Sequence, residues 1–227
     1  MAFVRTYGIF RTSGTVTTAT LGSVTFTTGN LAVIVIWWYN TMTDAITVSD
    51  SGPGGGGGWT KVPGTFKINP NTGTPNLGAQ IWTKQIGTGG TGITITATFP
   101  SNAFFPAIGG IEFSGRDTTN PIDVAVSATG LGVAGSGPGT TSTPGCDLFG
   151  AVYDDSGTES GQGSGWSFGS ILFTNYLTEY QQNVAIGSYS ATSNSGSSVQ
   201  YSAQMVALKS SSPPLVTGKP PVWSMVE

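Results

Sequence analysis

Apolar and polar residues alternate along most of this chain, with the period of two that is typical of β-strands. Ile93–Phe99 is the clearest case, because apolar side chains there alternate with threonine. Leu31–Tyr39 departs from the alternation: all nine residues are apolar or aromatic, which predicts a strand buried on both faces. The run is far shorter than the roughly 20 residues that span a bilayer, and the helical period is nearly absent. We therefore predict an all-β fold and no membrane insertion.

The predicted strands suit one antiparallel domain. Loops rich in Gly and Pro separate them, without helices between, and this favours antiparallel pairing. About a dozen strands at a spacing of roughly 8–12 residues predict a two-sheet β-sandwich or jelly roll. We place this single domain at residues 1–209. The predicted strands are Phe3–Phe10, Thr15–Thr27, Leu31–Tyr39, Ala45–Ser49, Trp59–Phe66, Ala79–Gln85, Gly92–Phe99, Ala107–Ser114, Ile122–Ala128, Asp147–Tyr153, Trp166–Phe173, Tyr180–Ala191 and Val199–Leu208.

Three long loops and a proline-rich end interrupt the strand pattern. The loops cover residues 50–58, 129–145 and 155–165. Loops of this length are often functional or mobile, and an inert surface loop is the alternative. Residues 210–227 contain four prolines, which favour an extended backbone and cannot join a central strand. We predict that this segment is an extended C-terminal arm.

Charge is scarce in this sequence, and this excludes several classes of function. Asp, Glu, Lys and Arg make up 8% of the 227 residues, against about 25% in an average soluble domain. There is no histidine, so Ser-His-Asp and Cys-His catalytic sets and histidine metal sites are excluded. The net charge is −3 and the basic residues are scattered, which argues against nucleic acid as a partner. No signal peptide is recognisable, so we expect synthesis in a cytoplasm.

The acidic residues offer few candidates for chemistry, because most lie at predicted strand ends or turns. Glu112 lies inside a predicted strand. We interpret it as a solvent-facing residue or a partner of Arg116, and a catalytic carboxylate of a glycan hydrolase or lyase is the alternative. Asp154, Asp155 and Glu159 are candidate calcium ligands on a flexible loop, and a solvated acidic turn is the alternative. We predict no other cofactor.

The glycine run and the tryptophans each have a structural interpretation. Gly54–Gly58 resembles a phosphate-binding loop, but it leads into the predicted strand at Trp59 and not into a Gly-Lys-Ser/Thr helix start. Trp37 and Trp38 must point to opposite faces of their strand. Because that strand is apolar throughout, we interpret it as buried on both sides, and a sugar-stacking aromatic platform is the alternative.

Two stretches of the sequence resemble a known family. One is Ile46–Asp50 followed by Trp59–Val62, and the other is Ile111–Asp123, with the sequence IEFSGRDTTNPID. With the strand of Trp82 and the closing Gln204–Lys209, they resemble Gly/Thr-rich β-sandwich proteins of phage virions (capsid decoration or tail) and uncharacterised bacterial surface proteins. The resemblance implies structural or adhesive work and supplies no catalytic residues. The five-glycine insert and the Pro-Trp tail depart from the family pattern.

These observations lead us to expect a non-enzymatic structural protein of a virion, assembled in the host cytoplasm. We expect a phage capsid decoration or cement protein, with a tail or fibre component close behind. Its partners would be the major capsid protein or another virion protein, and it would form a homo-oligomer through low-charge faces. The alternative is a carbohydrate-binding or adhesin module that takes a glycan. The residues expected to bind partners are apolar groups near both ends of the chain: Phe3, Tyr7, Phe10, Trp223 and Met225.

Overall fold

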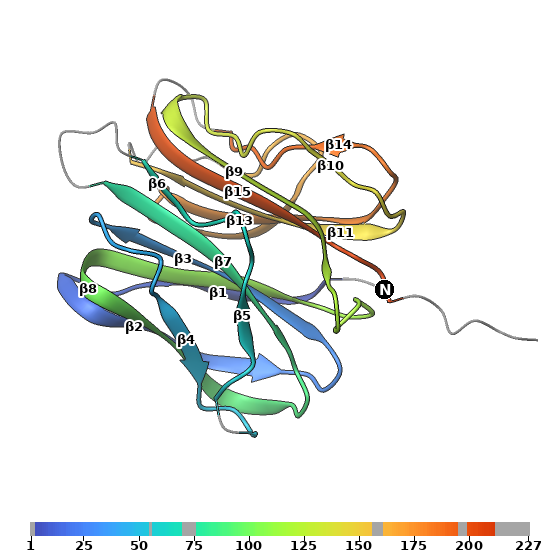
Figure 1. Cartoon of the computed structure of the whole chain (residues 1–227), viewed down its shortest axis with the longest axis horizontal. Helices are drawn as coiled ribbons and strands as arrows, with labels where there is room; N and C mark the ends of the chain where they lie inside the picture. Colours follow the sequence, from blue (N-terminus) through green and yellow to red (C-terminus); the bar gives the residue numbers. More distant parts are fainter. Residues whose placement is uncertain (1–2, 55, 70–75, 156–160, 195–198, 212–227) are drawn as a thin grey trace, which may run out of the picture.

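The computed structural model describes residues 3–54, 56–69, 76–155, 161–194 and 199–211 (Figure 1). These residues form fifteen strands and no helix, and the paired strands are antiparallel. The predicted all-β antiparallel fold is thereby confirmed. No helix in this part of the chain is long and apolar enough to cross a membrane.

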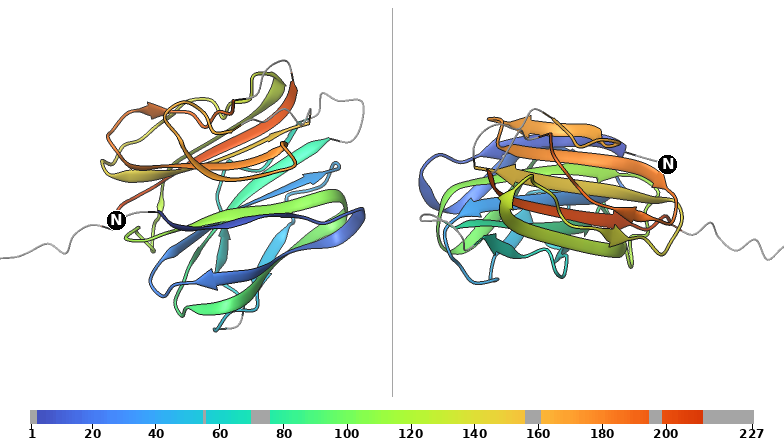
Figure 2. Two further views of the ribbon diagram at one scale, coloured as in Figure 1. Left: turned by 180° about the vertical axis from the view of Figure 1, so that it is seen from behind. Right: turned by 90° about the horizontal axis from the view of Figure 1, so that it is seen from above.

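Two large sheets contain nearly all of the strands, and the five-stranded sheet covers one face of the eight-stranded sheet (Figure 2). The eight-stranded sheet consists of β1 (Phe3–Arg11), β2 (Thr15–Phe26), β3 (Leu31–Tyr39), β4 (Thr47–Asp50), β5 (Trp59–Lys61), β6 (Lys67–Asn69), β7 (Leu77–Gln85) and β8 (Gly90–Phe113). The other strands are β9 (Ile122–Gly132), β10 (Gly139–Thr140), β11 (Cys146–Asp154), β12 (Ser167–Leu172), β13 (Tyr176–Val184), β14 (Ser188–Tyr189) and β15 (Val199–Leu208). The five-stranded sheet has the order β12-β13-β11-β15-β9, and a short ribbon pairs β10 with β14.

The long strand β8 makes the larger sheet fold over on itself. Its first half pairs with β2 and β4, and its second half pairs with β1 and β3. Between the halves Phe105 has a left-handed backbone with φ of 46°, which is uncommon for a residue other than glycine. The sequence predicted two strands here, at Gly92–Phe99 and Ala107–Ser114. The prediction of two separate strands was wrong, because the backbone bends here without ending the strand.

The central strand β3 is buried on both faces, as its sequence predicts. Its odd-numbered residues from Leu31 to Trp37 pack toward the five-stranded sheet, in a cluster that includes Phe149 and Val206. Its even-numbered residues from Ala32 to Trp38 pack toward the folded-over half, in a cluster that includes Ile95. Trp37 and Trp38 are both fully buried, so neither offers a face to a sugar.

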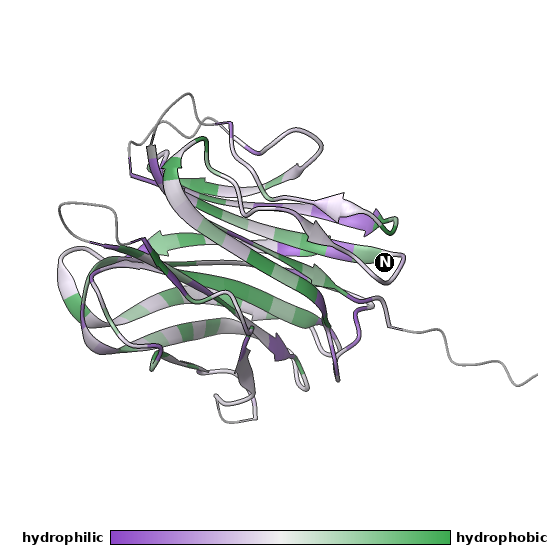
Figure 3. Cartoon of the chain, turned by 45° about the horizontal axis from the view of Figure 1, so that its top comes forward, coloured by the Kyte–Doolittle hydropathy of each residue, from purple (hydrophilic) through white to green (hydrophobic). Residues whose placement is uncertain are grey.

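Two irregular segments cover the outer face of the five-stranded sheet. The β10–β14 ribbon and the segment before β12 lie against a third apolar cluster, which contains Trp166 and Met205. Trp166 is fixed there by donating its indole N–H to the Ser190 carbonyl at 3.1 Å. The sequence predicted a strand over Tyr180–Ala191, but the strand ends at Val184 and only Ser188–Tyr189 pair again. Hydrophobic residues concentrate on the strands where the two large sheets face each other (Figure 3).

The close packing of Trp38 on β7 gives a test of the central layer. A Cβ on Gly78 would lie closer than 3.0 Å to the Trp38 ring. We expect Gly78→Ala to lower the free energy of unfolding by about 1–3 kcal/mol, because an overpacked core must shift. Urea unfolding followed by circular dichroism measures this loss. Gly57→Ala is the matched control, because a Cβ there meets nothing within 4 Å; equal losses in the two variants would contradict the packing argument.

Candidate binding groove

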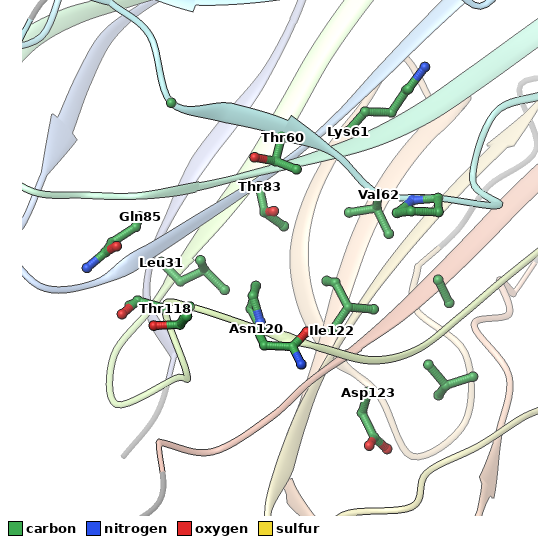
Figure 4. Close-up of a pocket in the computed structure, with 16 residues that line it drawn as sticks. Leu31, Thr60, Lys61, Val62, Thr83, Gln85, Thr118, Asn120, Ile122 and Asp123 are labelled. Carbon is green, nitrogen blue, oxygen red and sulfur yellow. The ribbon is translucent and has the colours of Figure 1, made fainter.

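A groove of about 700 Å³ opens where the edges of the two large sheets diverge (Figure 4). One wall is β5 with the start of its following turn, Gly58 to Pro63. The other wall is the turn Thr118–Pro121 with the first residues of β9, Ile122 to Ala125. The volume falls within the range of about 300–1,000 Å³ that is usual for ligand sites.

The groove has an apolar floor and neutral polar walls. Leu31 and Val62 are buried members of the core between the sheets, and they form its base. Of the residues that line the groove, Lys61 and Asp123 carry charge, one of each sign. The walls otherwise present hydroxyl and amide groups. The polar neutral lining residues are Thr60, Thr83, Gln85, Thr118, Thr119 and Asn120.

The turn that forms one wall is held by backbone hydrogen bonds. The Asp117 carboxylate accepts the amides of Asn120 and Thr119 at 3.0 and 2.9 Å, and these bonds lower the pKa of Asp117. The segment after β15 fixes the turn from outside: Lys209 N–H donates to the Pro121 carbonyl at 2.7 Å, and Asp117 N–H donates to the Lys209 carbonyl at 2.9 Å. The wall is therefore fixed before any ligand arrives.

Asp123 holds the base of the β9 wall to the following loop. Its carboxylate accepts the backbone amides and the hydroxyls of Ser142 and Thr143, at 2.6–3.4 Å. Burial alone raises the pKa of Asp123, but these four hydrogen bonds outweigh it and leave the pKa below the usual 3.8. The residue is ionised at neutral pH and already bonded, so it acts as a structural acceptor.

The groove is flanked by the last strand of each sheet. In the described residues β5 pairs only with β7, and β9 pairs only with β15. The two edges meet farther along β9, where the Ser127 hydroxyl donates to the Gly64 carbonyl at 2.7 Å and the Asn69 side-chain amide donates to the Gly130 carbonyl at 3.0 Å. The groove is thus confined to the beginning of β9. An unpaired strand edge beside an apolar floor suits an extended peptide.

The five-glycine loop is held to the domain by a buried acid. Asp50 donates its backbone N–H to the Gly56 carbonyl, and its carboxylate accepts the Gly52 amide at 2.8 Å. The same carboxylate binds the Lys84 ammonium at 2.5 Å and the Trp59 indole N–H at 2.7 Å. The charge of Lys84 is thus paired with Asp50 inside the domain.

Glu112 is not on the solvent face, which corrects the prediction from the sequence. It is fully buried, and its carboxylate accepts hydrogen bonds from Tyr7, Asn30 and the backbone of Thr27. The pKa of Tyr7 is raised well above its usual value. Burial is the larger cause, and the negative charge of Glu112 is the second. The cationic neighbour of Glu112 is Arg5, with 3.7 Å between the Arg5 Nε and the Glu112 Oε2, and not Arg116.

Arg116 instead approaches the buried carboxylate of Asp147, with 3.4 Å between Nε and Oδ2. Its guanidinium also donates to the Gly145 carbonyl at 2.9 Å. Burial raises the pKa of Asp147, and the Asn183 amide and Arg116 partly offset that rise. The pair therefore ties β11 to the end of β8 and to the loop before β11.

Of the residues predicted to bind partners, Phe10 is 52% exposed on β1. Phe3 and Tyr7 are half-buried in their own domain: Phe3 stacks on Tyr180 with ring centroids 4.3 Å apart, and Tyr7 bonds to Glu112. Trp223 and Met225 lie outside the described residues.

The calcium prediction falls partly outside the described residues, because Glu159 does. Asp154 is buried at the end of β11, and the next residue, Asp155, is exposed. Within the described ranges no group of three candidate metal-ligating side chains comes together. The calcium site stays a prediction.

Sequence reasoning did not identify the groove, although a signal for it was present. The two stretches singled out by the family resemblance, Trp59–Val62 and Ile111–Asp123, each supply part of one wall. Their meeting could not be predicted from spacing, because they lie on different sheets.

The hydrogen bonds to Asp123 predict a pH-dependent contribution to stability. We expect Asp123→Asn to lower the free energy of unfolding at neutral pH by about 1 kcal/mol, because a neutral amide accepts these bonds less well. The pKa of Asp123 is lowered in the folded state, so its contribution is present above 3.8 and is lost as the pH falls through the folded pKa.

Denaturant unfolding of wild type and Asp123→Asn at neutral and at strongly acidic pH measures the difference. The control is Asp44→Asn, which removes an exposed ion pair with Lys61 and should cost less than about 1 kcal/mol. A loss in Asp123→Asn that stays undiminished in acid would contradict the assignment.

Comparisons with known proteins provide no relative for this groove. No protein family, no curated protein and no solved structure matches the chain. The features of this chain that indicate a function are therefore its own groove, strand edges and buried carboxylates.

Proposed function

We propose that this chain is a non-enzymatic structural protein that assembles with other protein subunits in a virion. A capsid decoration or cement protein is the form that we propose, and a tail or fibre component is its close variant. The observation that carries the proposal is the groove, which is neutral, has an apolar floor and lies between two strand edges. Such a groove suits an extended segment of a partner protein.

The acidic side chains support a structural role for the chain. Six of those in the described residues accept backbone amide hydrogen bonds from loops, turns or a strand, which is structural work for a carboxylate. Asp44, a seventh, binds Lys61 and Gln80. The six acids are Asp50, Glu112, Asp117, Asp123, Asp147 and Glu179.

Low charge density favours docking between proteins. With 8% charged residues, a face of this protein can be covered by a neighbour without removing many ions from water, which is costly when they are left unpaired. Cores of protein interfaces are likewise depleted in charged residues.

The alternative, a carbohydrate-binding or adhesin module, needs an exposed aromatic face beside hydrogen-bonding groups. Trp37, Trp38, Trp82 and Trp166 are buried, and the half-buried Trp59 is bonded to Asp50. Among the residues that the structure describes, none of those lining the groove is aromatic. For the groove, these observations favour a protein segment over a sugar as the ligand.

Blocking the groove tests the proposal. We expect the wild-type chain to form a discrete oligomer or to sediment with phage particles, and Thr60→Arg to weaken this association at least about tenfold, or 1.4 kcal/mol. The reason is that Thr60 is exposed on β5 and lines the groove, so an arginine there occupies the space of a partner. Sedimentation velocity, together with gold labelling of particles in electron micrographs, provides the measurement.

The matched control is Thr20→Arg, which places the same side chain on an exposed position of β2, away from the groove. It should associate like wild type. A wild-type chain that stays monomeric and labels no particle would overturn the proposed function. Tight binding to a glycan array by the otherwise monomeric chain would favour the alternative.

A further inference from the structure

The last described residues run along the outside of the groove wall. Beyond β15, Lys209 and Asp117 are joined by the backbone hydrogen bond described above, and Arg116 and Ser210 form an isolated β-bridge. Ser211 N–H then donates to the Gly115 carbonyl at 3.0 Å. The start of the predicted arm is therefore attached to the sandwich. Its hydrogen-bond partner Gly115 lies three residues before Thr118, the first residue of that groove wall.

Sixteen residues, 212–227, follow Ser211 in the sequence. They contain four prolines, and Pro220-Pro221-Val222-Trp223 combines a stiff backbone with a large apolar side chain. Prolines have no N–H, so such a segment offers carbonyl acceptors and needs donors from its binding site. Asn120 and Gln85 supply amide donors on the groove walls, and Thr60 supplies a hydroxyl.

The charges of the two parts also match. Pro220 to Met225 carries no charge, and the two charged residues of the groove are occupied: Lys61 binds Asp44 at 2.8 Å, and Asp123 binds Ser142 and Thr143. An uncharged, apolar peptide can therefore enter the groove without stripping water from an unpaired ion.

We propose that the groove binds the segment Pro220–Met225 of a second copy of this chain. This inference rests on the proposed function and names a partner for its site. Trp223 is the twelfth residue after Ser211, and twelve steps of 3.1 Å would span about 37 Å in the polyproline conformation. In the same copy the groove wall begins three residues after Gly115, which binds Ser211, so residues 212–219 would have to fold back for Pro220–Met225 to enter that groove. A neighbouring copy accepts the segment in extended form.

The resulting contact is heterologous, because each copy gives a tail and receives a different one in its groove. Such contacts close into rings or continue as open arrays, depending on the rotation between copies. Trp223 would be the main anchor, since a tryptophan that fills a pocket is a frequent centre of binding energy.

Two complementary variants test the proposal. A chain truncated after Ser211 keeps the groove and lacks the segment, and full-length Thr60→Arg keeps the segment and has a blocked groove. By sedimentation velocity we expect each alone to be monomeric and their mixture to form one-to-one pairs. Wild type and Thr20→Arg should form larger assemblies, and full-length Trp223→Ala should associate at least about tenfold more weakly than wild type.

A synthetic peptide of residues 212–227 should bind the truncated chain, and should not bind the truncated chain that carries Thr60→Arg. Circular dichroism and thermal melting of each variant establish that it is folded. A mixture that does not pair, or a peptide that does not bind the folded truncated chain, would overturn the inference. A full-length chain that is monomeric and does not bind the peptide would also overturn the inference, because the C-terminal segment of the same copy would then occupy the groove.

The two proposals can fail separately. If truncation leaves the wild-type oligomer or particle binding intact, the C-terminal segment is not the occupant and the proposed function stands. If the full-length chain neither self-associates nor binds particles, the proposed function fails as well.

Discussion

The whole architecture depends on one strand that has no polar face. Because β3 is apolar at every position from Leu31 to Trp38, it is stable only with a packed layer on each side. The five-stranded sheet covers one face, and the folded-over half of the larger sheet covers the other. The bend in β8 is what allows one sheet to provide both the central layer and its cover. Two sheets thus enclose two cores.

The few acidic side chains of this protein serve the backbone, because they lie where loop amides need hydrogen-bond acceptors. Loops rich in glycine form few contacts of their own, and ordering them is costly in conformational entropy. Single carboxylates hold several of them: Asp50 holds the glycine-rich loop, Asp123 the loop before β11, and Glu179 the segments at Gly163 and Thr192. A chain with few charges can thereby keep long loops ordered around its sheets.

Local pattern was enough to predict most strands, the antiparallel fold and the opposite directions of Trp37 and Trp38. It was insufficient wherever two distant segments decide the result. Glu112 is buried because Tyr7 and Asn30, far away in sequence, supply its hydrogen bonds. Arg116 lies near Asp147 for the same reason. The groove has one wall from each sheet, so no single stretch of sequence contains it.

The order in which the chain is synthesised gives the pairing of β3 a further meaning. Both of its neighbours, β7 and β8, come after it, and β1 pairs with residues as distant as Phe113. On the ribosome, the most apolar segment of the protein therefore emerges well before any strand that can pair with it. Folds dominated by such distant pairings form slowly, and during folding they expose apolar surface and unpaired strand edges that favour aggregation. Until β8 has been made, Leu31–Tyr39 is therefore the segment of this chain with the most apolar surface open to non-native pairing.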